Sequence, residues 1–196
     1  TLNYDNVCLL SLLEQLASMM GQQAQEAGLQ FDVRTSNIMH PDFYGDALRI
    51  NQILINILGN AVKFTPEGGT VTFLTEEIPP ARGTEYVRYC FTIRDTGIGM
   101  PESFLSHLFE PFTRNRNTQR VEGSGLGLSI TKGLIELMGG KLYVESRERE
   151  GTAFRVELEY KIALEDNKGK TAKTMVSPAI SGENRLADRC LLVAED

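Results

Sequence analysis

Asn56, Asn60 and Lys63 lie four and three residues apart in a segment whose apolar residues recur at helical intervals. Side chains at this spacing project from one face of a helix. A carboxamide oxygen can ligate a hard cation without adding charge, and a lysine beside it offers a point charge to phosphate. The three residues therefore predict a site for a magnesium nucleotide. The alternative is a solvated helix face, because asparagine is only an indifferent helix former.

Asp95, Gly97 and Gly99 form a second motif directly after an expected strand. The two glycines allow a tight backbone turn. A carboxylate fixed at the end of the strand could accept a hydrogen bond from an exocyclic amine such as that of adenine. The alternative is an ordinary Asp-Gly turn, of which this motif by itself is more typical.

Gly123, Gly125 and Gly127 lead from a polar segment into an expected helix. Backbone N–H groups and the helix dipole at such a point attract phosphate. No strand of a dinucleotide-binding fold precedes these glycines, and no Gly-Lys-Ser or Gly-Lys-Thr ending marks a P-loop. The glycines fit phosphate binding but match neither of these two arrangements.

The composition excludes several classes of function. Among 196 residues, 20 are basic and 26 acidic, and the net charge of −6 opposes nonspecific nucleic-acid binding and direct membrane contact. The odd number of cysteines (Cys8, Cys90 and Cys190) and their wide spacing argue against disulfides and a metal cluster. No apolar run approaches the ~20 residues of a membrane span, and no signal peptide is present. We therefore expect a soluble cytoplasmic piece, and whether its parent is membrane-anchored stays open.

Hydrophobic periodicity indicates the elements that position these motifs. Helices are predicted over residues 4–27, 46–63 and 126–138, with a short helix over residues 101–109. Strands are predicted over residues 30–35, 70–77, 85–94, 141–146 and 152–160. Asp46 is the expected N-cap of the second helix, the strands at 70–77 and 85–94 should form a hairpin, and residues 113–124 are a candidate mobile loop. We expect an α/β two-layer sandwich, with a mixed, largely antiparallel sheet of about five strands covered on one face by three main helices.

Four blocks, in this order and spacing, resemble the ATP-binding catalytic domain of sensor histidine kinases, whose fold is shared with gyrase-type ATPases. Residues 56–65 resemble the N box of that family, residues 95–99 its first glycine box, residues 109–112 its F box and residues 123–128 its second glycine box. The resemblance covers about residues 1–160. It implies that ATP binds between the helices under a mobile lid.

The resemblance also implies individual roles. By it, Asn60 with Asn56 would hold Mg²⁺ and the phosphates, Lys63 would contact phosphate, Asp95 would bind the adenine amine, and Thr152 would assist at adenine. The other residues expected to bind the nucleotide come from the glycine and F boxes: Gly97, Gly99, Phe112, Gly123, Gly125, Leu126 and Gly127.

Arg114 is the expected residue that stabilises charge on the transferring phosphoryl group, and it joins Asn56 and Lys63 as the candidate catalytic residues. Arg116 and Arg120 are alternatives for the same role. Each of the three arginines also fits a solvated loop charge.

Asn56 separates kinase from hydrolase, because related ATPases usually carry a glutamate there and an amide cannot act as the general base that activates water. The resemblance thus implies a protein histidine kinase that transfers the ATP γ-phosphate to a histidine on a separate dimerisation domain. His40 and His107 do not resemble that acceptor. Two alternatives stay open: a degenerate nucleotide-binding interaction module and a hydrolytic gyrase-type ATPase.

The domain organisation expected from this resemblance has four parts. Residues 1–29 would form an N-terminal helix leading from a missing dimerisation domain, and residues 30–162 the ATP-binding domain. Residues 163–188 have linker composition. Residues 189–196 resemble the first strand of a response-regulator receiver domain, as in a hybrid kinase, although any buried strand with an acidic end fits them equally. The parent would be a homodimer.

Overall fold

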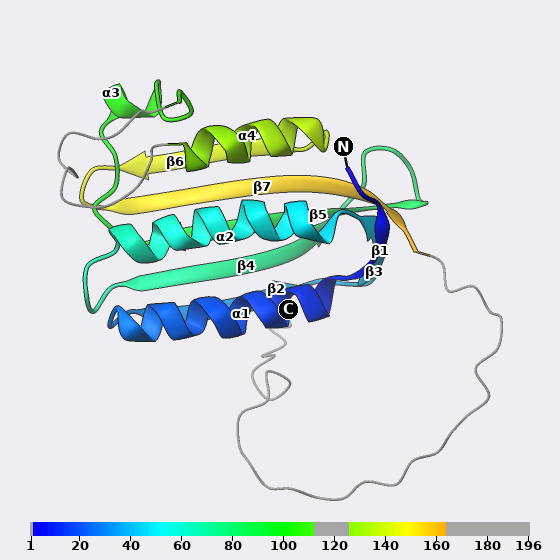
Figure 1. Ribbon diagram of the computed structural model, residues 1–196, viewed down its shortest axis with the longest axis horizontal. Helices are drawn as coiled ribbons and strands as arrows, with labels where there is room; N and C mark the ends of the chain where they lie inside the picture. The colour runs from blue at the N-terminus through cyan, green and yellow to red at the C-terminus, as the bar shows by residue number, and fades with distance from the viewer. Residues whose placement is uncertain (1, 112–125, 164–196) are drawn as a thin grey trace, which may run out of the picture. The chain divides into compact units, whose positions relative to one another are not determined.

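Three amphipathic helices form one layer of the structure (Figure 1). The computed structural model describes residues 2–111 and 126–163. The long helices are α1 (Leu9–Glu26), α2 (Ala47–Phe64) and α4 (Gly127–Leu137), and α3 (Glu102–Leu105) is short. The three long predicted helices are therefore confirmed, except that α1 begins at Leu9 rather than near residue 4, because residues 5–8 are extended. The short helix expected over residues 101–109 spans only residues 102–105.

The second layer is a seven-stranded sheet in the order β1-β3-β7-β5-β4-β2, with β6 paired to β7. Among the described strands, only β2 and β4 pair in parallel, so the expected mixed and largely antiparallel sheet is confirmed. The strands are β1 (Asp5–Cys8), β2 (Gln30–Ser36), β3 (Asp42–Gly45), β4 (Thr70–Ile78), β5 (Tyr86–Asp95), β6 (Lys141–Arg147) and β7 (Gly151–Ile162). The predicted hairpin is β4–β5, and β1 and β3 are two short strands beyond the five expected.

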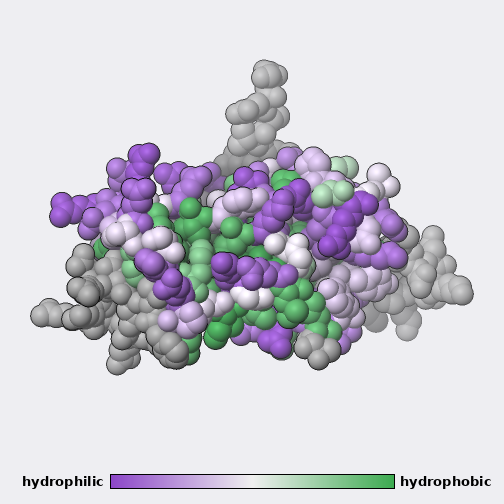
Figure 2. Space-filling model, turned by 90° about the horizontal axis from the view of Figure 1, so that it is seen from above, coloured by the Kyte–Doolittle hydropathy of each residue, from purple (hydrophilic) through white to green (hydrophobic). Residues whose placement is uncertain are grey.

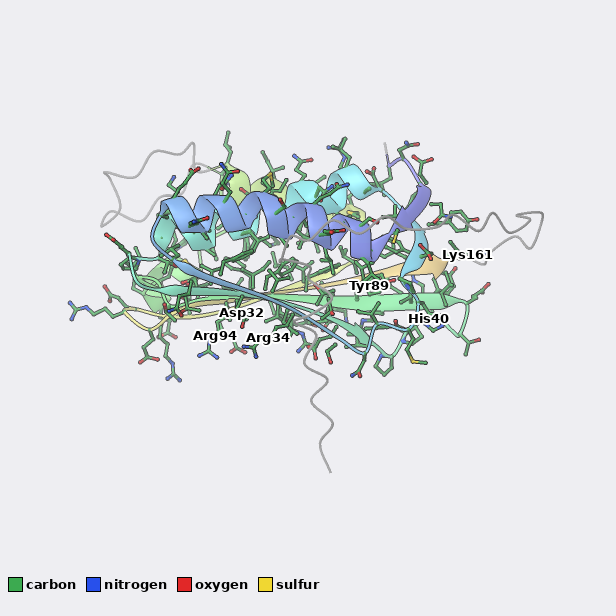
Figure 3. The ribbon with its side chains drawn as sticks, turned by 90° about the horizontal axis from the view of Figure 1, so that it is seen from below. Asp32, Arg34, His40, Tyr89, Arg94 and Lys161 are labelled. Carbon is green, nitrogen blue, oxygen red and sulfur yellow. The ribbon has the colours of Figure 1, made fainter. Side chains whose placement is uncertain are left out.

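The hydrophobic core lies between the helices and one face of the sheet (Figure 3). Its largest fully buried side chains include Phe43, Phe73, Tyr89 and Phe91, which come from three strands. The rings of Phe43 and Tyr89 meet edge to face, with their centroids 5.3 Å apart. The short strand β3 therefore contributes a central aromatic ring to the core.

Helix α2 crosses the middle of the helical layer (Figure 1) and buries one apolar stripe. The fully buried residues of this stripe are Ile50, Ile53, Leu54, Ile57 and Leu58. Asp46 caps the helix as predicted, because its Oδ1 accepts a hydrogen bond from the Arg49 backbone at 3.0 Å. The stripe and the cap fix which face of α2 remains available to the site.

The other face of the sheet is polar and carries Asp32, Arg34 and Arg94, which point away from the helices (Figure 3). Within residues 2–111 and 126–163, no helix combines the length and apolarity needed to cross a bilayer. The expected linker and receiver strand, residues 163–188 and 189–196, lie outside the described residues apart from Ala163.

Candidate active site

The two asparagines of α2 are half-buried, one turn apart, and Lys63 follows them on the same helix as an exposed side chain. The Lys63 ammonium lies 5.5 Å from the centre of the Phe64 ring. Within the described residues, the Asn60 side chain has no hydrogen-bond partner. The helix that the sequence predicts for Asn56, Asn60 and Lys63 is confirmed, and it leaves one carboxamide available to a ligand.

The start of α4 lies directly on Asn56. The Asn56 Nδ2 donates a hydrogen bond to the Thr131 hydroxyl at 2.6 Å. A Cβ added at Gly127 would overlap the Asn56 Oδ1, so only glycine allows this close approach. The third glycine of the second glycine box thus brings the N-terminal end of a helix, with its exposed N–H groups, to the N box.

Asp95 ends β5, and its side chain is only 6% exposed. Its Oδ1 accepts hydrogen bonds from the backbone N–H groups of Gly97 at 2.8 Å and Thr152 at 3.2 Å. Burial raises the pKa of this carboxyl above its ordinary value of 3.8, and the two backbone hydrogen bonds only partly offset that effect. Among the described residues its Oδ2 has no partner, yet it is not sealed from solvent, so it remains free to accept a hydrogen bond.

The glycines of the first glycine box are required by close backbone packing rather than by a turn alone. A Cβ at Gly97 would lie 2.6 Å from the Phe64 carbonyl oxygen and 2.7 Å from the Asp95 Oδ1. Gly99 has a φ of 61°, and a Cβ there would overlap the Arg147 carbonyl. The Ile98 N–H donates to the Phe64 carbonyl at 3.1 Å. These contacts tie the first glycine box to the end of α2.

Thr152 lies opposite Asp95 in the β5–β7 pairing, and it has a further partner that the motifs did not reveal. The Ser146 hydroxyl lies 2.9 Å from the Thr152 hydroxyl, accepts a hydrogen bond from the Met100 N–H at 2.9 Å and donates to the Gly151 carbonyl at 3.0 Å. Ser146 therefore joins β6, β7 and the segment after the first glycine box. Its only signal in the sequence is the alternation of β6, which does not distinguish it from other strand residues.

The C-terminal end of α2, the N-terminal end of α4 and the start of β7 lie at one end of the molecule (Figure 1). The described site residues gathered there are Asn56, Asn60, Lys63, Asp95, Gly97, Gly99, Gly127 and Thr152. Leu126 precedes α4 as its N-cap, and its carbonyl accepts a hydrogen bond from the Ile130 N–H at 3.0 Å. The remaining predicted site residues lie outside the described residues: Phe112, Arg114, Gly123 and Gly125, with the alternatives Arg116 and Arg120.

Both histidines are engaged with carboxylates. The His40 Nδ1 lies 2.6 Å from the Glu77 Oε1, and the His107 Nδ1 lies 2.8 Å from the Glu110 Oε1. The Glu77 carboxylate also accepts hydrogen bonds from the backbone N–H groups of Met39 and His40, so it holds the loop between β2 and β3 in place. These contacts are those of packing and surface histidines.

Comparison with known proteins identifies the family to which this chain is similar. A family model described as histidine kinase-, DNA gyrase B- and HSP90-like ATPase matches residues 45–162. Hybrid signal transduction histidine kinase A of Dictyostelium discoideum is 41% identical over 142 residues, which are 69% of this chain and 6% of that protein. Sensor histidine kinase AruS of Pseudomonas aeruginosa is 38% identical over 157 residues, which are 79% of this chain and 15% of that protein. The chain thus spans a small part of these relatives.

Solved structures agree in fold. Full-length ShkA, in complex with AMPPNP, has a TM-score of 0.69 and 32% identity, covering 83% of this chain and 32% of that one. The mycobacterial sensor histidine kinase MprB has a TM-score of 0.65 and 26% identity, covering 82% of this chain and 100% of that one. The chain therefore belongs to the family of histidine kinase-, DNA gyrase B- and HSP90-like ATPases, as the ATP-binding domain of a histidine kinase.

Proposed function

We propose that this chain binds Mg-ATP and supplies the γ-phosphate to a histidine on a separate dimerisation domain. The observation that carries this proposal is the buried Asp95 carboxylate, which has one oxygen engaged and the other without a partner among the described residues. An available carboxylate oxygen accepts the exocyclic amine of adenine, and a guanine would present a carbonyl there instead. Thr152, held against Asp95 and Ser146, assists at the same base.

The residues at the end of α2 fit a magnesium ion. Mg²⁺ takes oxygen ligands, and the Asn60 carboxamide has no partner among the described residues. The Asn56 carboxamide is half-buried and uses its nitrogen in the bond to Thr131, which leaves its oxygen for a cation. When bound, the ion neutralises charge on the phosphates. Lys63 contributes an exposed positive charge for the same phosphates, and the start of α4 contributes N–H groups.

Transfer rather than hydrolysis follows from the chemistry of Asn56. An amide has no basic site that could take a proton from water at neutral pH, so the described site lacks the general base that a hydrolase needs at this position. Catalysis would rest on positioning and charge stabilisation, with Arg114 as the residue proposed to stabilise the transferring phosphoryl group. The nucleophile would come from the dimerisation domain.

The partners of the parent protein are part of the proposal. Helix α1 would follow from the dimerisation domain of a homodimeric parent, and residues 163–188 would lead to a receiver domain beginning at residues 189–196. A solved structure of the histidine kinase ThkA in complex with the response regulator TrrA, 25% identical to this chain with a TM-score of 0.63, supports a receiver domain as partner. Because ATP is the substrate, we place this domain in the cytoplasm.

Calorimetric titration and an ATP turnover assay on the same sample test the proposal. We expect saturable Mg-ATP binding, no steady release of phosphate and no phosphohistidine on His40 or His107. Asn56→Glu, which restores a potential base, should raise phosphate release, and Asn56→Gln is its neutral control. Steady turnover by the wild type would point to a hydrolytic ATPase, and an absence of binding by the folded wild type would point to a degenerate interaction module.

A further inference from the structure

The hydrogen bond from Asn56 to Thr131 joins residues that are 75 positions apart in the chain. Thr131 lies on α4, one turn after Gly127, and is only 2% exposed. The 2.6 Å separation of the Asn56 Nδ2 and the Thr131 Oγ1 is at the short end for a bond of this kind. A buried hydroxyl thus contacts one of the two carboxamides proposed to hold the metal, although no motif in the sequence includes it.

The carboxamide of Asn56 lies against two successive turns of α4. Its nitrogen faces Thr131, and its oxygen faces Gly127 at the first position of the helix. The N-terminal end of a helix carries partial positive charge, which favours the oxygen there. If the carboxamide were reversed, its NH₂ group would face the N–H groups of the helix start. The Thr131 hydroxyl could also donate to the oxygen of a reversed carboxamide, so the helix end selects the orientation of the amide, and the hydrogen bond to Thr131 holds the amide in place.

We propose that Thr131 is a positioning residue that holds the Asn56 carboxamide with its oxygen toward the metal and phosphates. This inference rests on the proposed function, because it assigns Thr131 a role in Mg-ATP binding. Mg²⁺ binds oxygen and not an amide NH₂, so a carboxamide turned by half a rotation would oppose the cation instead of ligating it. Thr131 acts through Asn56, and it also links α4 to α2 at the point where the phosphates would lie.

A purely structural role for Thr131 leads to a different expected result. If its buried side chain only packed α4 against α2, removing the hydroxyl would weaken nucleotide binding to the same extent with and without magnesium. Thr75 provides a matched control, because it is also fully buried and its hydroxyl has no hydrogen-bond partner in the part of the chain that the structure describes. Thr75 lies on β4 in the core, away from the site residues.

The test is calorimetric titration of ATP, with Mg²⁺ and with EDTA, into the wild type, Thr131→Val, Thr131→Ser and Thr75→Val. Valine keeps the shape of threonine and removes the hydroxyl, and serine retains it. Loss of one ordinary hydrogen bond should weaken Mg-ATP binding about 3- to 10-fold in Thr131→Val and leave Mg-free binding unchanged. Thr131→Ser should bind Mg-ATP as the wild type does, and Thr75→Val should change neither affinity.

A second readout needs no nucleotide. In the NMR spectrum of the free protein, Thr131→Val should shift the side-chain NH₂ signals of Asn56, and Thr75→Val should leave them in place. If Thr131→Val does not fold, Thr131→Ala removes the same hydroxyl with less bulk and takes its place in both experiments.

The outcomes separate the inference from the proposed function. An equal loss of affinity with and without Mg²⁺, or no loss at all in Thr131→Val, would overturn the positioning role while Mg-ATP binding by the wild type stands. Failure of the folded wild type to bind ATP under either condition would overturn the proposed function, and the inference with it.

Discussion

Replacing Asp95 by asparagine changes the proposed adenine site with little change in shape. In the wild type, the backbone N–H groups of Gly97 and Thr152 donate hydrogen bonds to the Asp95 Oδ1, and the asparagine oxygen can still accept both. The second carboxylate oxygen becomes an NH₂ group, and that group opposes the exocyclic amine of adenine instead of accepting from it. The substitution therefore removes one recognition contact and preserves the local backbone.

The size of the effect follows from the charge of the lost acceptor. A hydrogen bond to a charged group contributes about 1.5–3 kcal/mol, and about 1.4 kcal/mol corresponds to a tenfold change in affinity. We expect Asp95→Asn to weaken ATP and ADP binding about 10- to 150-fold. Asp32→Asn, on the polar face of the sheet, removes an exposed carboxylate paired with Arg34 and should leave both affinities unchanged.

The same substitution should not destabilise the free protein at neutral pH. Burial raises the pKa of Asp95, so the fold favours the protonated form, and the stability that this preference contributes is present below the ordinary pKa of 3.8. That contribution is lost as the pH rises through the folded-state pKa. The free energy of unfolding of Asp95→Asn, relative to the wild type, should therefore increase between about pH 3 and pH 7.

Titration calorimetry and urea unfolding at several pH values measure these two effects independently. An Asp95→Asn protein that is as stable as the wild type at pH 7 but binds ATP weakly would agree with a recognition role. Unchanged ATP affinity in that protein would refute the assignment of adenine to Asp95. A loss of stability that grows as the pH rises would refute the argument from burial.

Three further expectations concern the elements that position the site. Asp46→Ala removes the cap of α2 and should lower the free energy of unfolding by about 1 kcal/mol at pH 7. Burial alone would raise the pKa of Asp46, but hydrogen bonds from the backbone N–H groups of Asn3 and Arg49 outweigh burial, and the pKa is lowered overall. In urea unfolding, the difference in free energy of unfolding between Asp46→Ala and the wild type should therefore shrink as the pH falls through the folded-state pKa. Gly127→Ala would overlap the Asn56 oxygen, so its Mg-ATP affinity should fall while Gly133→Ala, on an open part of α4, binds normally in the same titration. Leu58→Ala removes a fully buried side chain from α2 and should cost about 2–5 kcal/mol by thermal or urea unfolding, and a smaller cost would contradict the packing of α2 on the sheet.

Helix α2 shows what periodicity can predict. Its buried stripe and its cap at Asp46 can both be predicted from the sequence, because each depends on residues within a few positions of one another. The strands β1 and β3 were missed, because each has four residues and neither has room for clear alternation. Val7 of β1 also fitted the apolar pattern of the helix that follows, so the helix was predicted to begin too early.

The site residues also fall into two groups, those that short motifs predict and those that depend on contacts between distant parts of the sequence. Short motifs in the sequence predict Asp95 and the glycines, but the reason for Gly97 and Gly99 is the closeness of the Phe64 and Arg147 carbonyls, which are distant in sequence. Ser146 and Thr131 carry no local motif at all.

The measurement that tests the central claim most directly is NMR chemical-shift mapping during titration with Mg-ATP. The largest shifts should occur at Asn60, Asp95 and Thr152, and the signals of Asp32 and Arg34 on the opposite face of the sheet should not change. Shifts confined to that opposite face, or no shifts at saturating Mg-ATP, would contradict the proposed ATP site.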